Sequence, residues 1–98
     1  MAHVIDTAAR KVVAKVLVDS RPRRAEWTAD GAQFWVSAEI GGTVSVIDAA
    51  KRQVNRITFS VPGVAAEAIQ PVGIAITRDR KLAFVALGPA NRVAVIDA

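Results

Sequence analysis

Apolar residues in this chain occur in short runs rich in β-branched side chains, and each run ends at a turn signal. Runs of this kind predict strands, and turn signals every 8–12 residues are typical of all-β proteins. No segment keeps a period of 3.6 residues, so no helix is expected. The expected strands are residues 4–6, 12–18, 25–28, 33–38, 43–49, 54–60, 72–77, 82–87 and 92–98.

One strand motif appears three times along the chain. It ends in Val-Ile-Asp near position 47, and the same ending recurs at Asp6 and Asp97. Asp6 and Asp48 are 42 residues apart, and Asp48 and Asp97 are 49 apart. Pro22 and Pro71 keep the same spacing of 49. A period in the forties with several short strands per unit is typical of β-propeller blades.

The repeat also predicts how the chain is divided. If each blade has strands A to D from the axis outward, the strand order is C-D, A-B-C-D, A-B-C. Residues 1–18 are then the last strands of a preceding blade, residues 19–60 a complete blade, and residues 61–98 three strands of the next blade. The second unit is longer, and its extra residues are expected as an inserted surface loop at 61–70, because loops tolerate insertions.

The predicted fold class is therefore all-β, with antiparallel four-stranded β-propeller blades. A blade takes roughly 40–45 residues, so the 98 residues hold a little over two. A closed propeller has roughly four to eight blades. The chain is expected to be a fragment of a larger propeller, or to associate with itself through its open blade edges.

Two stretches resemble the YVTN-type propeller repeat, namely residues 71–79 and 43–48. Arg80 replaces the glycine of the Asp-Gly turn that Gly31 keeps, and Arg23 stands where Gly73 stands in the next unit. The chain therefore follows the repeat without all of its glycines.

A narrower similarity lies in residues 20–27, 37–42 and 86–92. These segments are similar to the β-propeller proteins associated with PQQ-dependent catabolism. The resemblance implies a bacterial, periplasmic or secreted parent of about seven blades. It implies no catalytic residue for this chain, and it does not imply that the propeller itself binds PQQ.

Composition narrows the possible partners. Hydrophobic residues make up 52% of the chain and charged residues 22%, which favours a packed protein over a disordered one. No apolar run approaches the roughly 18 residues of a membrane span, so no membrane partner is expected. The net charge of +4 permits acidic partners without demanding nucleic acid. Cysteine is absent, which removes disulfides and thiolate metal sites.

The candidate binding residues lie in the loops that join strand D to A and strand B to C. These loops open on one face of a propeller, and binding residues usually lie in loops held by a rigid scaffold. The candidates are Arg21, Arg23, Arg24, Glu39, Asn91 and Arg92.

The arginines at 21–24 have two interpretations. They can bind a carboxylate or phosphate through bidentate contacts, or they can be solvated or paired with Glu26, Glu39 or Glu67. The second interpretation is favoured, because most exposed ion pairs are weak.

Other residues have a structural interpretation. Trp27 and Trp35 are expected to pack between blades, because no aromatic binding motif surrounds them. The three repeated aspartates are expected to cap turns. His3 has no partner motif for a metal site. No phosphate loop, serine nucleophile motif or metal-binding motif is present, so no cofactor and no catalysis are expected.

Three functions remain open on the sequence. The first is a non-catalytic scaffold that binds a protein or a small anionic ligand on the loop face. The second is an accessory or enzymatic subunit of a quinoprotein oxidation system, which rests on the resemblance alone. The third is binding of nucleic acid or another anion through residues 21–24. Of these two ligands, nucleic acid is the less favoured.

Overall fold

Nine strands make up the architecture of the chain, and the computed structural model describes all 98 residues. The only helical segment is a 3-10 turn, η1, at Ala66–Ala68. The strands are β1 (Ala2–Asp6), β2 (Lys11–Val16), β3 (Pro22–Trp27), β4 (Gln33–Ala38), β5 (Thr43–Asp48), β6 (Val54–Thr58), β7 (Pro71–Ile76), β8 (Leu82–Leu87) and β9 (Arg92–Asp97).

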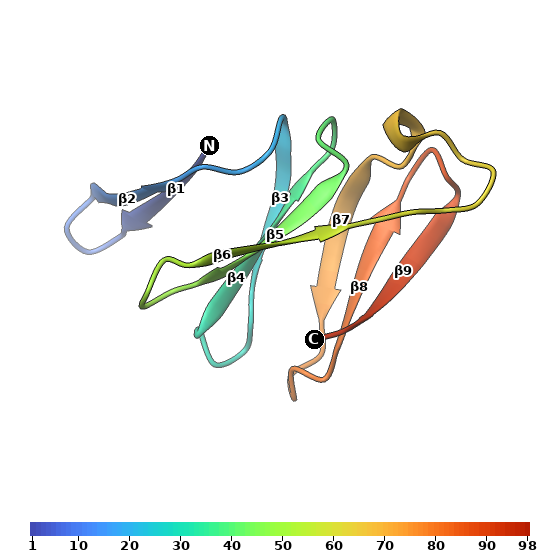
Figure 1. Cartoon of the computed structure of the whole chain (residues 1–98). Helices are drawn as coiled ribbons and strands as arrows, with labels where there is room; N and C mark the ends of the chain where they lie inside the picture. The colour runs from blue at the N-terminus through green and yellow to red at the C-terminus, as the bar shows by residue number, and fades with distance from the viewer.

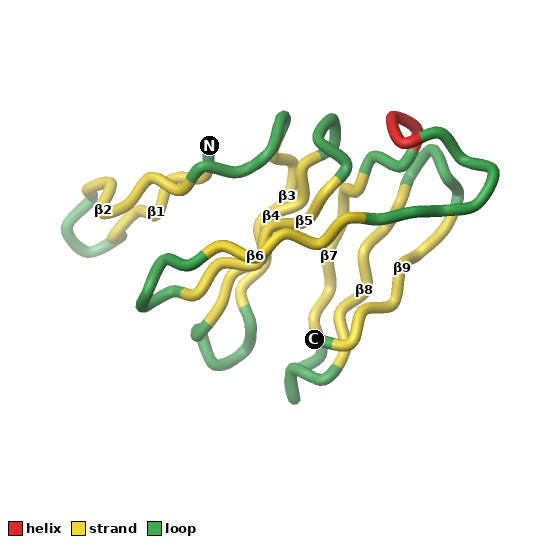
Figure 2. Tube along the Cα trace, viewed as in Figure 1, coloured by secondary structure: helices red, strands yellow, loops and turns green.

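The strands form three separate antiparallel sheets, which lie one after another along the molecule (Figure 1). The first sheet holds β1 and β2, the second β3 to β6, and the third β7 to β9, each in sequential order. Figure 2 shows that strands and loops account for nearly all of the trace. The all-β class and the antiparallel sheets are confirmed, and the arrangement is consistent with propeller blades. No helix is long and apolar enough to cross a membrane.

The strand expected at 25–28 starts earlier than predicted. β3 begins at Pro22, which pairs with Ala38, and an irregularity in register precedes Arg24. Proline is tolerated as the first residue of a strand, because its missing N–H interrupts the ladder least there. Arg23 and Arg24 therefore lie in a strand, and the prediction that they belong to a loop is wrong.

One apolar core lies between the first and second sheets. Val16 at the end of β2 and Val18 in the segment that follows it pack against Phe34, Val36 and Ile47 from the second sheet. β4 presents Phe34 and Val36 to this side and Trp35 to the other, because successive side chains of a strand point to opposite faces. The second sheet is thus apolar on both faces, as a sheet between two others must be.

A second core lies between the second and third sheets. Trp35 is 2% exposed and lies there with Val44, Val85 and Leu87. The prediction that Trp35 packs between sheets is confirmed. Trp27 differs: it is 51% exposed and its ring contacts Phe34 at a centroid distance of 4.9 Å. The expectation of core packing for Trp27 is wrong in this chain, because the first sheet has only two strands and the core on that side forms around Phe34, Val36 and Ile47, without Trp27.

The inserted segment at 61–70 is less peripheral than expected. It runs along the end of the third sheet and includes η1 (Figure 1). Ile69 is buried in the second core, and Val61 and Val64 pack against that core. Apolar side chains on both sides of the 3-10 turn anchor the segment, so the expectation of a simple surface loop is corrected.

Aspartates cap the turns between strands as predicted. Asp48 Oδ1 accepts hydrogen bonds from the backbone N–H of Ala50 at 3.0 Å and of Lys51 at 2.8 Å. Asp6 does the same for Ala8 and Ala9. These backbone N–H groups, Lys51 first, hold the pKa of Asp48 below its usual range. The predicted capping role is thus confirmed for Asp6 and Asp48, whereas Asp97 accepts no hydrogen bond.

Candidate functional site

The loop face is formed where the segment before β3 meets the β4–β5 turn. The N–H of Glu39 donates to the carbonyl of Arg21 at 2.9 Å, and the N–H of Gly41 donates to that of Ser20 at 3.1 Å. The Asp19 side chain approaches Gly41 so closely that a Cβ on Gly41 would collide with it. The turn and the segment thus form one rigid unit.

Two of the predicted arginines share one carboxylate on this unit. Arg21 Nε lies 3.5 Å from Glu39 Oε1, and Arg23 Nη1 lies 3.4 Å from Glu39 Oε2. The Glu39 side chain is 19% exposed, whereas both guanidinium side chains are more than half exposed. Two cations and one anion leave a net positive charge at the surface, with guanidinium N–H groups that face solvent.

Backbone conformation also holds Arg21 in place. It has a positive φ of 59°, which is uncommon for a residue other than glycine. Gln70, which also precedes a proline and lies 49 residues later, has a φ of 40°. Because the conformation recurs at an equivalent position, it is a feature of the repeat, at the residue that precedes the first strand of the second and of the third sheet. Arg21 thus contacts Glu39 from a backbone conformation that the repeat itself imposes.

Arg24 lies apart from this group. Its Nη2 lies 2.9 Å from Glu26 Oε2, and its backbone N–H donates to Ser37 Oγ at 3.2 Å. Glu39 and Glu26 thus pair with the arginines as the structural interpretation expected, whereas Glu67 pairs with none of them. The structure brings Arg21, Arg23 and Glu39 together, and it leaves Arg24 in a neutral pair.

Asn91 and Arg92 lie at a different turn. They belong to the turn between β8 and β9, where Asn91 has a φ of 58° and takes the place that Gly42 has in the second sheet. Arg92 Nη1 donates to the Ala90 carbonyl at 2.7 Å and forms no ion pair. No hydrogen bond or ion pair joins this turn to the Arg21–Glu39–Arg23 group, so the six predicted residues do not form one site.

A shallow hollow of about 220 Å³ lies beside the group, between β1 and β3. Arg23, Arg24 and His3 are among the residues that line it. The hollow adds His3 to the surroundings of the arginines, although no motif in the sequence connects His3 with them.

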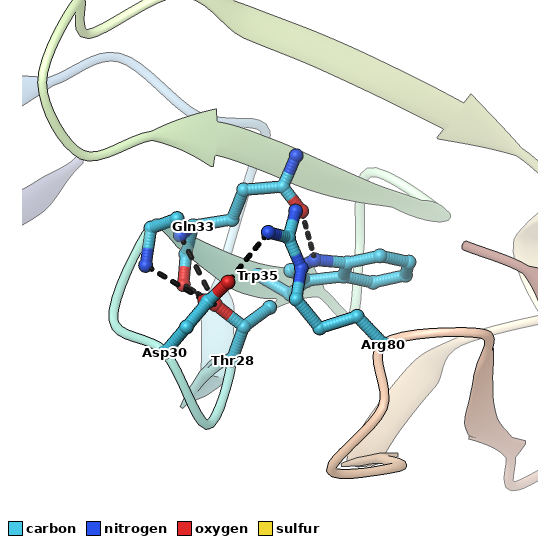
Figure 3. A network of polar contacts seen from close by, with 6 residues as sticks. Thr28, Asp30, Gln33, Trp35 and Arg80 are labelled. Atoms are coloured by element: carbon cyan, nitrogen blue, oxygen red, sulfur yellow. Dashed lines mark hydrogen bonds and ion pairs between the residues drawn. The ribbon is translucent and has the colours of Figure 1, made fainter.

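A polar network that the sequence analysis missed lies at the opposite ends of the strands (Figure 3). Thr28 Oγ1 donates to Asp30 Oδ1 at 2.7 Å, and Arg80 Nη1 from the third sheet donates to Asp30 Oδ2 at 2.7 Å. The hydrogen bond from Thr28, followed by those from Ala32 and Arg80, lowers the pKa of Asp30 to about 2. The recurrence of Thr-x-Asp at 28 and 77 was the available clue to this network.

The third sheet repeats half of this network. Thr77 Oγ1 donates to Asp79 Oδ1 at 2.7 Å, and this bond is the largest cause of a lowered pKa at Asp79. No arginine from a further sheet reaches Asp79 in this chain. The network therefore links consecutive sheets.

The chemistry that the geometry of the loop face supports is contact with anions. No group of three or more histidine, cysteine, aspartate or glutamate residues lies close enough to hold a metal ion. The geometry supports ion pairing and anion contacts at the loop face, where Arg21 and Arg23 present N–H donors.

Comparison with family models and with curated proteins finds no match. Comparison with solved structures finds hydrazine synthase from Kuenenia stuttgartiensis, with a TM-score of 0.80 and 30% sequence identity. The similarity covers 96% of this chain and 25% of that one, so the chain spans about a quarter of the length of its structural relative.

Proposed function

We propose that this chain is a non-catalytic segment of a β-propeller whose loop face binds an anionic ligand or an acidic protein surface. The observation that carries the proposal is the Arg21–Glu39–Arg23 group, in which one carboxylate is shared by two half-exposed arginines. Charge alone would not define a site, but here the cations are held in place by a rigid turn.

Glu39 contributes orientation and Arg21 and Arg23 contribute the binding groups. A guanidinium has five N–H donors, and a contact with one carboxylate oxygen leaves several of them free. Planar guanidinium groups match the geometry of carboxylates and phosphates. Because Glu39 limits the movement of both side chains, less conformational entropy is lost when an anion binds.

The proposal also covers the location, the number of blades and the metabolic context of the whole protein. A periplasmic parent of about seven blades, linked to PQQ-dependent oxidation, is supported by the resemblance of residues 20–27, 37–42 and 86–92 to that group of propellers. The chain itself is proposed to hold no cofactor. Sequencing the parent gene would test these features, since blade count and a leader peptide are visible there.

A second candidate function is a scaffold segment within a larger enzyme subunit. The similarity to a quarter of hydrazine synthase supports this candidate. In that case the chain would position other parts of the subunit, and the reacting groups would lie outside residues 1–98. Purifying the parent and assaying it with and without these residues would test the candidate.

The binding proposal is tested by titrating the 98-residue chain with a glutamate-rich peptide and with inorganic phosphate, using calorimetry. We expect Arg21→Ala/Arg23→Ala to weaken binding of at least one probe tenfold or more. The matched control is Arg52→Ala/Arg56→Ala, which removes the same charge from the opposite turn and from the outer strand β6. Equal weakening by both double variants would show that only net charge matters, and the proposed site would then be wrong.

A third probe, a single-stranded oligonucleotide, and the salt dependence of its binding distinguish nucleic acid from an acidic protein as the ligand. Binding to a single-stranded oligonucleotide through phosphates should fall steeply as salt is added. We expect the peptide to bind more tightly than the oligonucleotide at physiological ionic strength. The reverse order would replace the acidic partner by nucleic acid as the ligand of this face.

A further inference from the structure

The β4–β5 turn presents an aliphatic side chain to solvent directly beside the anion-binding group. Ile40 is 64% exposed, and it follows Glu39, whose carboxylate contacts Arg21 and Arg23. One exposed aliphatic residue is ordinary on a protein surface, so exposure alone gives Ile40 no function. Its surroundings on the loop face distinguish it from other exposed aliphatic residues.

The turn that carries Ile40 lies between two other segments of the loop face. On one side, Gly41 is in close contact with the side chain of Asp19. On the other side, a Cβ on Gly42 would lie 3.8 Å from the carbonyl oxygen of Ala66 in η1. Figure 1 shows the three segments in a row at one end of the strands. Both neighbours of the turn on this face are thus in place, and Ile40 remains exposed between them.

The two ends of this row differ in charge. Arg21 and Arg23 lie at one end, where their side chains are more than half exposed. The inserted segment at the other end exposes a single charged side chain, the carboxylate of Glu67. A carboxylate of a ligand is attracted by the arginines and repelled by Glu67. An acidic ligand therefore places its acid at the arginine end, and the part of the ligand next to the acid lies over Ile40.

The third sheet does not repeat this combination of cations and an aliphatic residue. At the positions 49 residues later, Arg21, Arg23, Glu39 and Ile40 are replaced by Gln70, Val72, Gly88 and Pro89. Residues that build the sheets recur at this spacing, as the Thr-x-Asp of residues 28–30 does at 77–79. The repeat itself therefore does not require the combination, which leaves these positions available for recognition.

We propose that the loop face binds a peptide segment in which an acidic residue stands next to an aliphatic one. The acid contacts Arg21 and Arg23, and the aliphatic side chain packs on Ile40. Charge complementarity selects the acid, and the apolar contact adds a feature that phosphate cannot match. An extended peptide can contact a row of three segments, whereas small molecules bind mainly in concave sites. This inference rests on the proposed function and names the class of its acidic ligand.

Two peptides of equal charge test the apolar contact by calorimetry. One is Gly-Leu-Glu-Glu-Leu-Gly and the other is Gly-Gly-Glu-Glu-Gly-Gly, both blocked at their ends. A leucine adjoins the acids in either chain direction, so the test does not depend on the orientation of the peptide. We expect the wild-type chain to bind the leucine peptide about tenfold more tightly, because part of one leucine side chain is removed from water.

Variants of Ile40 assign this preference to one side chain. Ile40→Ala should remove the preference for the leucine peptide, whereas Ile40→Leu should keep it. The matched control is Leu82→Ala, which truncates an exposed aliphatic residue of the same size at the opposite end of the strands. The control should keep the preference. Arg21→Ala/Arg23→Ala should weaken the binding of both peptides.

The outcomes separate this inference from the proposed function. Equal affinity for the two peptides, or a preference that survives Ile40→Ala, would overturn the inference. The anion site would still stand if Arg21→Ala/Arg23→Ala weakened both peptides. If neither peptide bound, or if the arginine variant had no effect, both proposals would be wrong. Inorganic phosphate that bound as tightly as the leucine peptide would assign the face to a small anion and overturn the peptide as its ligand.

Discussion

Arg80 Nη1 donates a hydrogen bond to Asp30 Oδ2 at 2.7 Å, and this bond joins the third sheet to the second at the end opposite the loop face (Figure 3). Arg80 occupies the turn position that Gly31 occupies in the second sheet, and it keeps the same left-handed backbone with a φ of 62°. The chain has thus placed a long cation where a glycine is conformationally favoured. An arginine at this position, in contrast to a glycine, forms an ion pair with Asp30.

Two variants of Arg80 separate the ion pair from the backbone strain. Arg80→Ala removes the bond and keeps a side chain in the left-handed region, whereas Arg80→Gly removes both. We expect Arg80→Gly to be more stable than Arg80→Ala by about 1 kcal/mol in urea unfolding. Equal stability of the two variants would mean that this turn does not strain a side chain.

Acid should weaken the folded state through Asp30. Its folded pKa of about 2 lies below the usual value near 3.9, so the carboxylate contributes stability above pH 4 and loses it as the pH falls toward 2. Asp30→Asn should therefore flatten the fall in melting temperature between pH 5 and pH 2. Asp97→Asn, which removes a carboxylate that accepts no hydrogen bond, controls for the loss of one negative charge.

Two buried serines should respond in opposite ways to removal of the hydroxyl. Ser37 Oγ donates to the Val72 carbonyl at 2.7 Å and accepts from the Arg24 N–H, whereas Ser45 Oγ is buried without a partner. We expect Ser37→Ala to cost about 1 to 3 kcal/mol and Ser45→Ala to be neutral or stabilising. Chemical denaturation of the two variants checks this. A large loss at Ser45 would indicate a bound water or an unrecognised acceptor.

The inserted segment should contribute to stability through Ile69. Ile69→Ala removes a buried side chain from the core between the second and third sheets, and a change of this kind typically costs about 2 to 5 kcal/mol. Ile40→Ala, at an exposed position of the neighbouring turn, should change stability by less than about 0.5 kcal/mol. A small effect at Ile69 would restore the view of residues 61–70 as a loose surface loop.

The strands and the turn caps were visible in the sequence because both depend on local patterns. Each strand follows from a short β-branched run, and each capping aspartate bonds to N–H groups two or three residues away. The spacing of Asp6, Asp48 and Asp97 showed that the strands repeat, and the repeat predicted the order of the strands. Most expected strand ends differ from the observed ones by only a few residues, as at β3, where pairing of Pro22 with Ala38 extends the strand.

Contacts between residues distant in sequence were decided only by the tertiary structure. Glu39 could have paired with any nearby arginine, and the approach of the β4–β5 turn to Ser20 and Arg21 selected Arg21 and Arg23. Trp27 and Trp35 both lie in strands, yet Trp35 is covered by the third sheet and Trp27 has no complete sheet opposite it. Strand formation depends on neighbours along the chain, whereas burial and ion pairing depend on which sheet lies opposite. A two-residue or three-residue pattern holds no information about that opposite sheet.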